Sequence, residues 1–283
     1  MIDLISEKTG AAIRRICEVL CLPRSSYYQA ARPTQTVLDD QMIGERIKTI
    51  FHHHRRRYGY RRIQDDLEDL GITCGTARVR RLMKELGLKA IQPRNFIPRT
   101  SDGRADKPSL NLLLDRADPT RLNEVWIGDI TFIPTSKGWR YLAVVIDLFS
   151  RNVIGWSLAD HLRADLVGDA MTKALKSRPR HGELIFHSDR GSQYGSKIFR
   201  AILDQAEVTQ SMSRRANPYD NAWTESFMGT LKKEMLQGGC FIDENDARIE
   251  LFAFIDGYYN TERKHSALGY LSPKKFESNL YQN

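Results

Sequence analysis

Hydrophobic periodicity divides the chain into an N-terminal helical part and a later part that mixes strands with helices. In residues 8–30 the apolar positions recur at helical spacing and predict two short helices, and residues 37–54 predict a longer helix with one apolar face. Two further helices are predicted, one from about Ile63 to a stop near Gly71 and one over 76–86. Short helices joined by glycine turns, the last one basic, are typical of a helix-turn-helix.

The pattern changes after a segment rich in Pro, Arg, Asp and Ser, which predicts a linker. Beyond it, period-two alternation and apolar runs predict strands, and longer periodic segments predict helices. The strands are expected at 125–133, 139–149, 152–158, 183–186 and 208–212, and the helices at 164–177, 196–206 and from about 222 to 236. This order is that of a ribonuclease-H-like α/β fold, so we expect a mixed five-stranded sheet with helices, preceded by an all-α region.

These elements define five expected parts of the chain. They are a short helical, helix-turn-helix-like segment (1–34), a helix-turn-helix-like DNA-binding domain (35–92), a linker (93–121), a ribonuclease-H-like catalytic core (122–237) and a C-terminal helical extension of that core (238–283).

Composition narrows the class of protein. The chain has 283 residues, 41% of them hydrophobic and 28% charged, which is typical of a soluble globular protein. It contains neither a run of ~20 apolar residues that could span a membrane nor an export signal. The four cysteines form no C-x-x-C pair, and Cys17 and Cys21 are expected to be buried as small hydrophobic residues. We therefore expect a protein of the reducing cytoplasm, associated with the nucleoid.

The positive charge is confined to the first third of the chain. Residues 1–100 hold 19 Lys or Arg and 11 Asp or Glu, whereas the remainder holds 24 of each kind. Because Lys and Arg neutralise phosphates, this asymmetry predicts a nucleic-acid partner; a solvated basic face is the alternative. We interpret His52–His54 as part of a basic surface patch rather than as metal ligands. The candidate DNA-binding residues in this third are Arg55, Arg56, Arg57, Arg61, Arg62, Arg78, Arg80, Arg81 and Lys84.

Three acids in the second half lie in settings that one active site could combine. Asp129 lies inside an apolar run, Asp189 follows a predicted strand, and Glu225 opens an amphipathic helix, with 59 and 35 residues between them. A charge inside an apolar strand must be compensated, and a metal ion compensates three converging acids. A turn-capping Asp129, an ordinary turn aspartate at 189 and a solvated Glu225 are the simpler interpretations of each residue taken alone.

A fourth acid, Asp147, also lies in an apolar strand. It could be a further metal ligand or a structural residue at the strand end, and we favour the structural role. Lys232 lies two helical turns beyond Glu225 on the same face, where its ammonium could contact a phosphate.

The donor set predicts the chemistry. Carboxylate oxygens without a His or Cys cluster favour Mg²⁺ or Mn²⁺ over zinc. Two such ions can activate a water or a 3′-hydroxyl and stabilise the leaving oxygen in an in-line phosphoryl displacement.

The acids, their spacing and Lys232 resemble those of DDE transposases and retroviral integrases. The neighbouring residues are similar to the insertion-sequence-three family over nearly the whole chain. The matching motifs are Tyr58–Ile63, Arg78–Gly87, Trp126–Thr131, His187–Tyr194, Asp220–Ala222 with Glu225–Phe227, and Tyr259–Pro273.

The resemblance implies a DNA transposase of a bacterial insertion sequence, the product of its second reading frame (OrfB). It implies that Asp129, Asp189 and Glu225 bind the metal ions, that Lys232 contacts DNA near the element's end, and that Asp147 corresponds to no catalytic acid. The implied partners are the terminal inverted repeats, the target DNA, further copies of the chain on DNA, and the first-frame product or frameshift fusion, because the family's leucine-zipper segment is not found in this chain. Cys21 stands where family members often have Gly, so the turn at 20–23 is expected to differ.

Two other classes of function remain open at this point. A nuclease of the same fold recruited by the host would keep the acids without transposing, and a DNA-binding regulator of the element would need no acids. The intact triad argues against the regulator, and the basic N-terminal third argues against a plain ribonuclease H.

Overall fold

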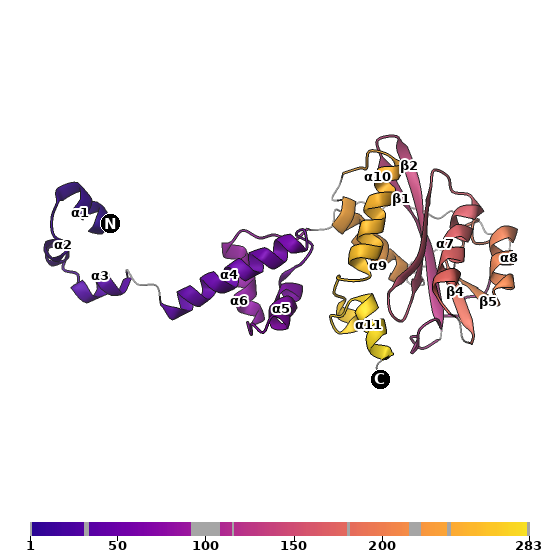
Figure 1. Cartoon of the computed structure of the whole chain (residues 1–283), viewed down its shortest axis with the longest axis horizontal. Helices are drawn as coiled ribbons and strands as arrows, with labels where there is room; N and C mark the ends of the chain where they lie inside the picture. The colour runs from indigo at the N-terminus through magenta and orange to yellow at the C-terminus, as the bar shows by residue number, and fades with distance from the viewer. Residues whose placement is uncertain are drawn as a thin grey trace. The chain divides into compact units, whose positions relative to one another are not determined.

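The computed structural model describes residues 2–30, 34–91, 108–114, 116–179, 182–214, 222–236 and 239–281, but not the side chains of residues 29, 30 and 222. The chain divides into two compact units, Met1–Ala90 and Ile91–Asn283. Figure 1 labels most of their helices and strands. Among the described helices, none is both long and apolar enough to cross a membrane.

The first unit is built from helices only. Three short helices, α1 (Ile2–Thr9), α2 (Ile13–Val19) and α3 (Arg24–Ala30), precede the longer α4 (Gln35–His53) and the pair α5 (Tyr60–Asp69) and α6 (Thr76–Glu85). The last three helices pack on one another through apolar faces, which include Ile47 from α4, Leu67 from α5 and Val79 from α6. The helical spacing read from the sequence therefore corresponds to the buried faces of α4, α5 and α6.

Two expectations for this unit were wrong in detail. Cys17 is buried as predicted, but Cys21 is exposed. Cys21 adopts a left-handed φ of 52°, a conformation that glycine reaches at little cost. His54 does not belong to the surface patch, because it is buried, stacks on Tyr58 at 3.6 Å between ring centroids, and lies 2.9 Å from Asp66 Oδ2 through Nε2.

The second unit is built around a five-stranded sheet in the order β3-β2-β1-β4-β5. Its strands are β1 (Val125–Thr135), β2 (Gly138–Asp147), β3 (Val153–Ala159), β4 (Leu184–Ser188) and β5 (Val208–Met212). β1 pairs antiparallel with β2 and parallel with β4, so it is the central strand, as its two apolar faces predict. This mixed sheet with helices agrees with the fold class expected from the sequence.

Helices cover the two faces of the sheet, as Figure 1 shows. On one face lie α7 (Ala164–Ser177) and α8 (Lys197–Gln205), over a core that includes Trp126, Ile130 and Phe186. A Cβ on Gly155 of β3 would lie 2.3 Å from the carbonyl oxygen of Ala170, so glycine at this position lets α7 approach the sheet closely.

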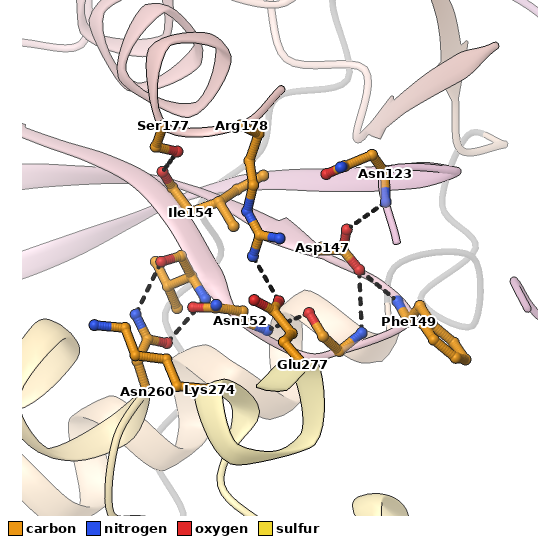
Figure 2. Close-up of polar contacts among 12 residues, drawn as sticks. Asn123, Asp147, Phe149, Asn152, Ile154, Ser177, Arg178, Asn260, Lys274 and Glu277 are labelled. Carbon is orange, nitrogen blue, oxygen red and sulfur yellow. Dashed lines mark hydrogen bonds and ion pairs between the residues drawn. The ribbon is translucent and has the colours of Figure 1, made fainter. Parts of the chain in front are cut away.

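The other face carries α9 (Ala222–Leu231), which continues as a π-helix over Lys232–Leu236, and α10 (Glu244–Phe252), which continues as a π-helix over Ala253–Tyr259. A 3₁₀ turn (Ser266–Leu268) and α11 (Pro273–Leu280) complete the unit. Asn260 attaches this C-terminal part to β3, because its side chain accepts from the Val153 N–H (3.0 Å) and donates to the Val153 carbonyl (2.9 Å). Figure 2 shows Asn260 near the half-buried Arg178–Glu277 ion pair.

The end of the expected linker lies along the edge strand β5. The Met212 N–H donates to the Leu110 carbonyl, the Leu112 N–H donates to Ser211 Oγ, and Ser109 Oγ donates to Gln210 Oε1. Residues 108–112 thereby occupy hydrogen-bonding groups of an edge that would otherwise be open to another chain.

Candidate active site

Asp129 lies on the central strand β1, where strand alternation separates it from the α7–α8 core. Trp126 and Ile130 belong to that core, and Asp129 with Ile127 faces the opposite side, toward α9. The side chain is buried, with 9% of the residue exposed, and its Oδ1 accepts the N–H of Ile130 at 2.8 Å.

The sheet register brings Asp189 beside Asp129. Ile127 of β1 is paired with His187 of β4 in parallel, and two further residues along each strand lead to Asp129 and Asp189. Equal steps from a parallel pair preserve the facing direction, so the two carboxylates are carried to the same region at the end of β4. This arrangement follows from topology, because the two residues are far apart in sequence.

The loop after β4 is held by hydrogen bonds of its own. Asp189 Oδ1 accepts the N–H of Gly191 at 2.9 Å, and Arg190 Nε donates to the Ser213 carbonyl at 2.7 Å. Beneath the loop, the buried His187 bonds through Nδ1 to Ser211 Oγ at 2.8 Å. Asp189 therefore projects from an ordered turn, half-buried at the strand end.

Glu225 lies in the first turn of α9, the helix that packs on β1. The buried stripe of this helix consists of Thr224, Phe227, Met228 and Leu231. Trp223, four residues before Phe227 on the same side of the helix, is only half-buried. Glu225 is exposed, as its position away from the stripe predicts, at the end of α9 that leads toward the two aspartates.

The electrostatics of Asp129 show that the acids influence one another. The pKa of Asp129 is raised from 3.8 to about 8, mainly by burial and then by the charges of Asp189 and Glu225, while the Ile130 N–H and Lys232 oppose the shift. Among described residues, no three ligand atoms within 4.8 Å of one another include these acids, so they do not close on a single point. Two repelling carboxylates with a third nearby form a donor set suited to divalent cations that prefer oxygen.

Lys232 lies close enough to Asp129 for each charge to influence the pKa of the other group. It begins the π-helix that follows α9, and it is half-buried. Burial lowers the pKa of Lys232, and the negative charge of Asp129 opposes that shift. A side chain on a helix leans toward the N-terminus of the helix, so the long Lys232 chain reaches back toward Asp129 despite the two turns between Lys232 and Glu225.

Asp147 is held by backbone groups of the β2–β3 turn and of Asn123, which precedes β1. Its Oδ2 accepts the N–H of Asn123 at 2.7 Å, and its Oδ1 accepts the N–H groups of Phe149 at 3.0 Å and Ser150 at 3.1 Å (Figure 2). Burial raises the pKa of Asp147, while the Asn123 and Ser150 donors lower it. Each oxygen already has a backbone partner, which fits the structural role favoured from the sequence.

The basic candidates of the first unit differ in their surroundings. Arg55 and Arg56 are exposed and adopt left-handed φ values of 48° and 64°, in the turn that follows α4; Arg57 is half-buried. Arg62 is half-buried with its guanidinium over the ring of Tyr58 at 5.4 Å. The turn therefore presents Arg55 and Arg56 to solvent more openly than the residues that follow.

The basic residues of α6 fall into two groups. Arg78 and Arg81 form ion pairs with Asp40 of α4, at 2.7 and 2.6 Å. Arg80 and Lys84 are exposed, and the guanidinium groups of Arg80 and Arg61 lie 5.9 and 5.3 Å from the ring centroid of Tyr60. The sequence did not reveal Asp40 as the partner, because the pairing joins helices that are distant along the chain.

The comparisons with known proteins agree with this architecture. The family model described as an HTH-like domain matches residues 38–96, and two models described as an integrase core domain match residues 119–218 and 206–273. The second integrase core match includes α9, α10 and Asn260, which the structure places on the same sheet.

Solved structures show a weaker likeness. A chain of the simian T-cell lymphotropic virus intasome is 17% identical with a TM-score of 0.46, covering 75% of this chain and 69% of that one. The HTLV-2 integrase catalytic core domain, in complex with magnesium, is 17% identical with a TM-score of 0.42, covering 60% and 99%. At these scores the fold assignment depends on the strand order and the family models.

Similar sequences cover almost the whole chain. The transposase for insertion sequence element IS904 of Lactococcus lactis is 42% identical, over 87% of this chain and 97% of that protein. The 31 kDa protein of insertion element IS600 of Shigella sonnei is 37% identical over 94% and 99%, and transposase InsF for IS3A of Escherichia coli K12 is 36% identical over 94% of each. The chain belongs to the insertion-sequence-three family of transposases, within the superfamily of DDE transposases and retroviral integrases.

Proposed function

We propose that this transposase cleaves DNA at the ends of its own insertion sequence and joins the freed 3′-hydroxyl to target DNA, with Asp129, Asp189 and Glu225 as metal ligands. The proposal rests on the approach of these acids at the end of β4, where Asp189 and Glu225 both raise the pKa of a buried Asp129. Family membership supports the reaction class.

The site fits Mg²⁺ or Mn²⁺. All three groups are carboxylates, and no His or Cys lies among them. When bound, a pair of ions would supply activation of the attacking oxygen and stabilisation of the leaving oxygen. The burial of Asp129 lowers the local dielectric, which strengthens its attraction for a cation.

The proposed reaction has two steps, cleavage and joining. In cleavage, a water oxygen attacks the phosphodiester at the element's end, and the broken P–O bond leaves a 3′-hydroxyl and a 5′-phosphate. In joining, that 3′-hydroxyl oxygen attacks a target phosphodiester and displaces a target 3′-oxygen. Lys232, half-buried beside Asp129, would hold a phosphate of the incoming strand by charge.

The first unit would supply DNA affinity. Its net positive charge and the HTH-like match over 38–96 support binding to the terminal repeats. Arg55, Arg56, Arg61, Arg80 and Lys84 are its best-placed contacts, because each is exposed. For Arg78 and Arg81 we propose a structural role: their ion pairs with Asp40 hold α6 against α4 and so orient the exposed basic side chains of α6.

The test is a strand assay with purified full-length chain. Labelled duplexes carrying the element's terminal repeats, with and without target plasmid, would be incubated with Mg²⁺ or Mn²⁺, or with EDTA. The proposal expects metal-dependent nicking at the repeat boundary and, with plasmid, joined products. A host-recruited nuclease would nick without joining, and a regulator would bind the repeats without either product. If the fused upstream frame is required, adding it would restore the products, so the assay includes that form.

A further inference from the structure

A tyrosine hydroxyl is buried beneath the acids without a hydrogen-bond partner among the residues that the structure describes. Tyr194 is 2% exposed, and its hydroxyl oxygen has neither solvent contact nor a bonding partner. Leaving a buried hydroxyl unsatisfied costs about 1–3 kcal/mol, and phenylalanine would fill nearly the same volume without that cost. The hydroxyl therefore needs an explanation other than packing.

The ring of Tyr194 cannot easily turn away. It packs against Phe186 at 5.9 Å and against Phe199 at 5.4 Å between ring centroids. The backbone of Tyr194 is fixed as well, because its N–H donates to the Gly191 carbonyl and its carbonyl accepts from Gln210 Nε2 at 2.8 Å. The position of the hydroxyl is thus set by the loop that also carries Asp189.

The hydroxyl is packed against the residue that precedes Asp129. A Cβ built on Gly128 would lie 3.4 Å from the phenol oxygen and only 2.4 Å from the ring of Phe186. Glycine at this position therefore leaves room for the two rings to approach β1. Burial raises the pKa of the phenol well above its ordinary value, and the charges of Asp129 and Asp189 add to this, so the phenol keeps its proton as a donor.

We propose that Tyr194 is a positioning residue for the metal-binding acids, whose hydroxyl donates a hydrogen bond to the Asp129–Asp189 pair in the metal-bound site. Ionised carboxylates only accept hydrogen bonds, and a neutral phenol supplies a donor. Outer donors of this kind fix the orientation of metal ligands, and their removal typically weakens metal binding 10- to 100-fold. This inference rests on the proposed function of the acids.

The experiment compares wild-type chain with Tyr194→Phe, which removes only the hydroxyl. Thermal unfolding is followed by tryptophan fluorescence in EDTA and over a series of Mn²⁺ and Mg²⁺ concentrations. All four tryptophans lie in the second unit, so the signal reports that unit alone. We expect an unchanged or higher melting temperature in EDTA, and a metal concentration for half-maximal stabilisation raised about 10-fold.

Tyr141→Phe is the matched control. It removes the same atom from a tyrosine on β2 that packs on Phe132 and is not among the groups that shift the pKa of Asp129, so its metal midpoint should equal that of wild type. An unchanged metal midpoint in Tyr194→Phe, whatever its melting temperature in EDTA, would overturn the positioning role and leave the metal site standing. Absence of any metal effect in the wild type would instead refute the proposed function itself.

Discussion

Replacing Asp129 by Asn should stabilise the metal-free second unit while it abolishes metal binding. The carboxylate is buried on the central strand, its charge is repelled by Asp189 and Glu225, and its nearest backbone donor is the Ile130 N–H. Asparagine keeps the shape, and its side-chain oxygen can still accept that N–H, but it carries no charge. A ligand that costs stability in the absence of its ion is common at functional sites.

The size of the effect follows from the pKa shift. Asp129 has an ordinary pKa of 3.8 and a pKa of about 8 in the folded protein. Between these pH values the folded state binds a proton that the unfolded state has released, so stability falls as pH rises, by up to about 1.4 kcal/mol per pH unit. At pH 7 the accumulated cost is at most about 4 kcal/mol, and relaxation around the acids would reduce it.

Urea unfolding in EDTA, followed by tryptophan fluorescence at pH 5, 6, 7 and 8, measures this effect on the second unit. The variant's advantage in free energy of unfolding should grow with pH, from about 1 kcal/mol at pH 5 to between about 2 and 4 kcal/mol at pH 7. Addition of Mg²⁺ should stabilise the wild type and leave Asp129→Asn unchanged, because binding to the folded state alone raises stability.

Asp147→Asn is the matched control, since it makes the same change in the neighbouring strand. There each oxygen accepts at least one backbone N–H, so an NH₂ group must face a donor, and we expect a loss of about 1–3 kcal/mol at pH 7. Asp129→Asn that is no more stable than wild type at pH 8 in EDTA would refute the electrostatic cost assigned to this carboxylate.

Three further outcomes are expected elsewhere in the chain. Replacing Arg55–Arg57 by alanine should flatten the slope of log affinity for DNA against log salt by up to about three, at roughly 0.9 for each phosphate that the variant no longer neutralises; an unchanged slope would mark the patch as merely solvated. Lys232→Ala should lower end-DNA binding and joining without altering the Mn²⁺ midpoint for stabilisation, and Lys232→Arg should restore part of the loss; a shifted midpoint would contradict this. Arg263→Met should cost about 3–5 kcal/mol in urea unfolding, because it leaves the carboxylate of Glu234 buried without its ion-pair partner (2.8 Å); a loss below about 1 kcal/mol would be inconsistent with a tightly buried pair.

The sequence predicted the parts of the site that depend on periodicity. Alternation along β1 puts Asp129 on the face opposite Trp126 and Ile130, and the structure has that division of faces. Helical spacing likewise puts Glu225 away from Phe227 and Leu231, and Glu225 is exposed in the structure. These features are local, because a side chain's direction within one strand or helix is set by the backbone geometry of that element.

Features that depend on distant partners could not be predicted in this way. Asp40 bonds Arg78 and Arg81 from 38 and 41 residues away, and Asn260 reaches Val153 from 107 residues away. The π-helix at Lys232 also has no signal in an apolar pattern that assumes 3.6 residues per turn. Tyr194 was visible only as part of a motif, and its significance appears once the fold shows a buried hydroxyl without a partner among the described residues.

The most direct test of the proposed metal site is cleavage and joining by the three amide variants Asp129→Asn, Asp189→Asn and Glu225→Gln. Each would be assayed with labelled end DNA in Mg²⁺ and in Mn²⁺, beside wild type and Asp147→Asn, with DNA affinity measured in parallel. We predict that each of the three retains DNA binding and loses nicking and joining, while folded Asp147→Asn keeps the wild-type metal dependence. If any of the three keeps more than a few per cent of wild-type joining, that residue is not a metal ligand and the proposed site is wrong at that position.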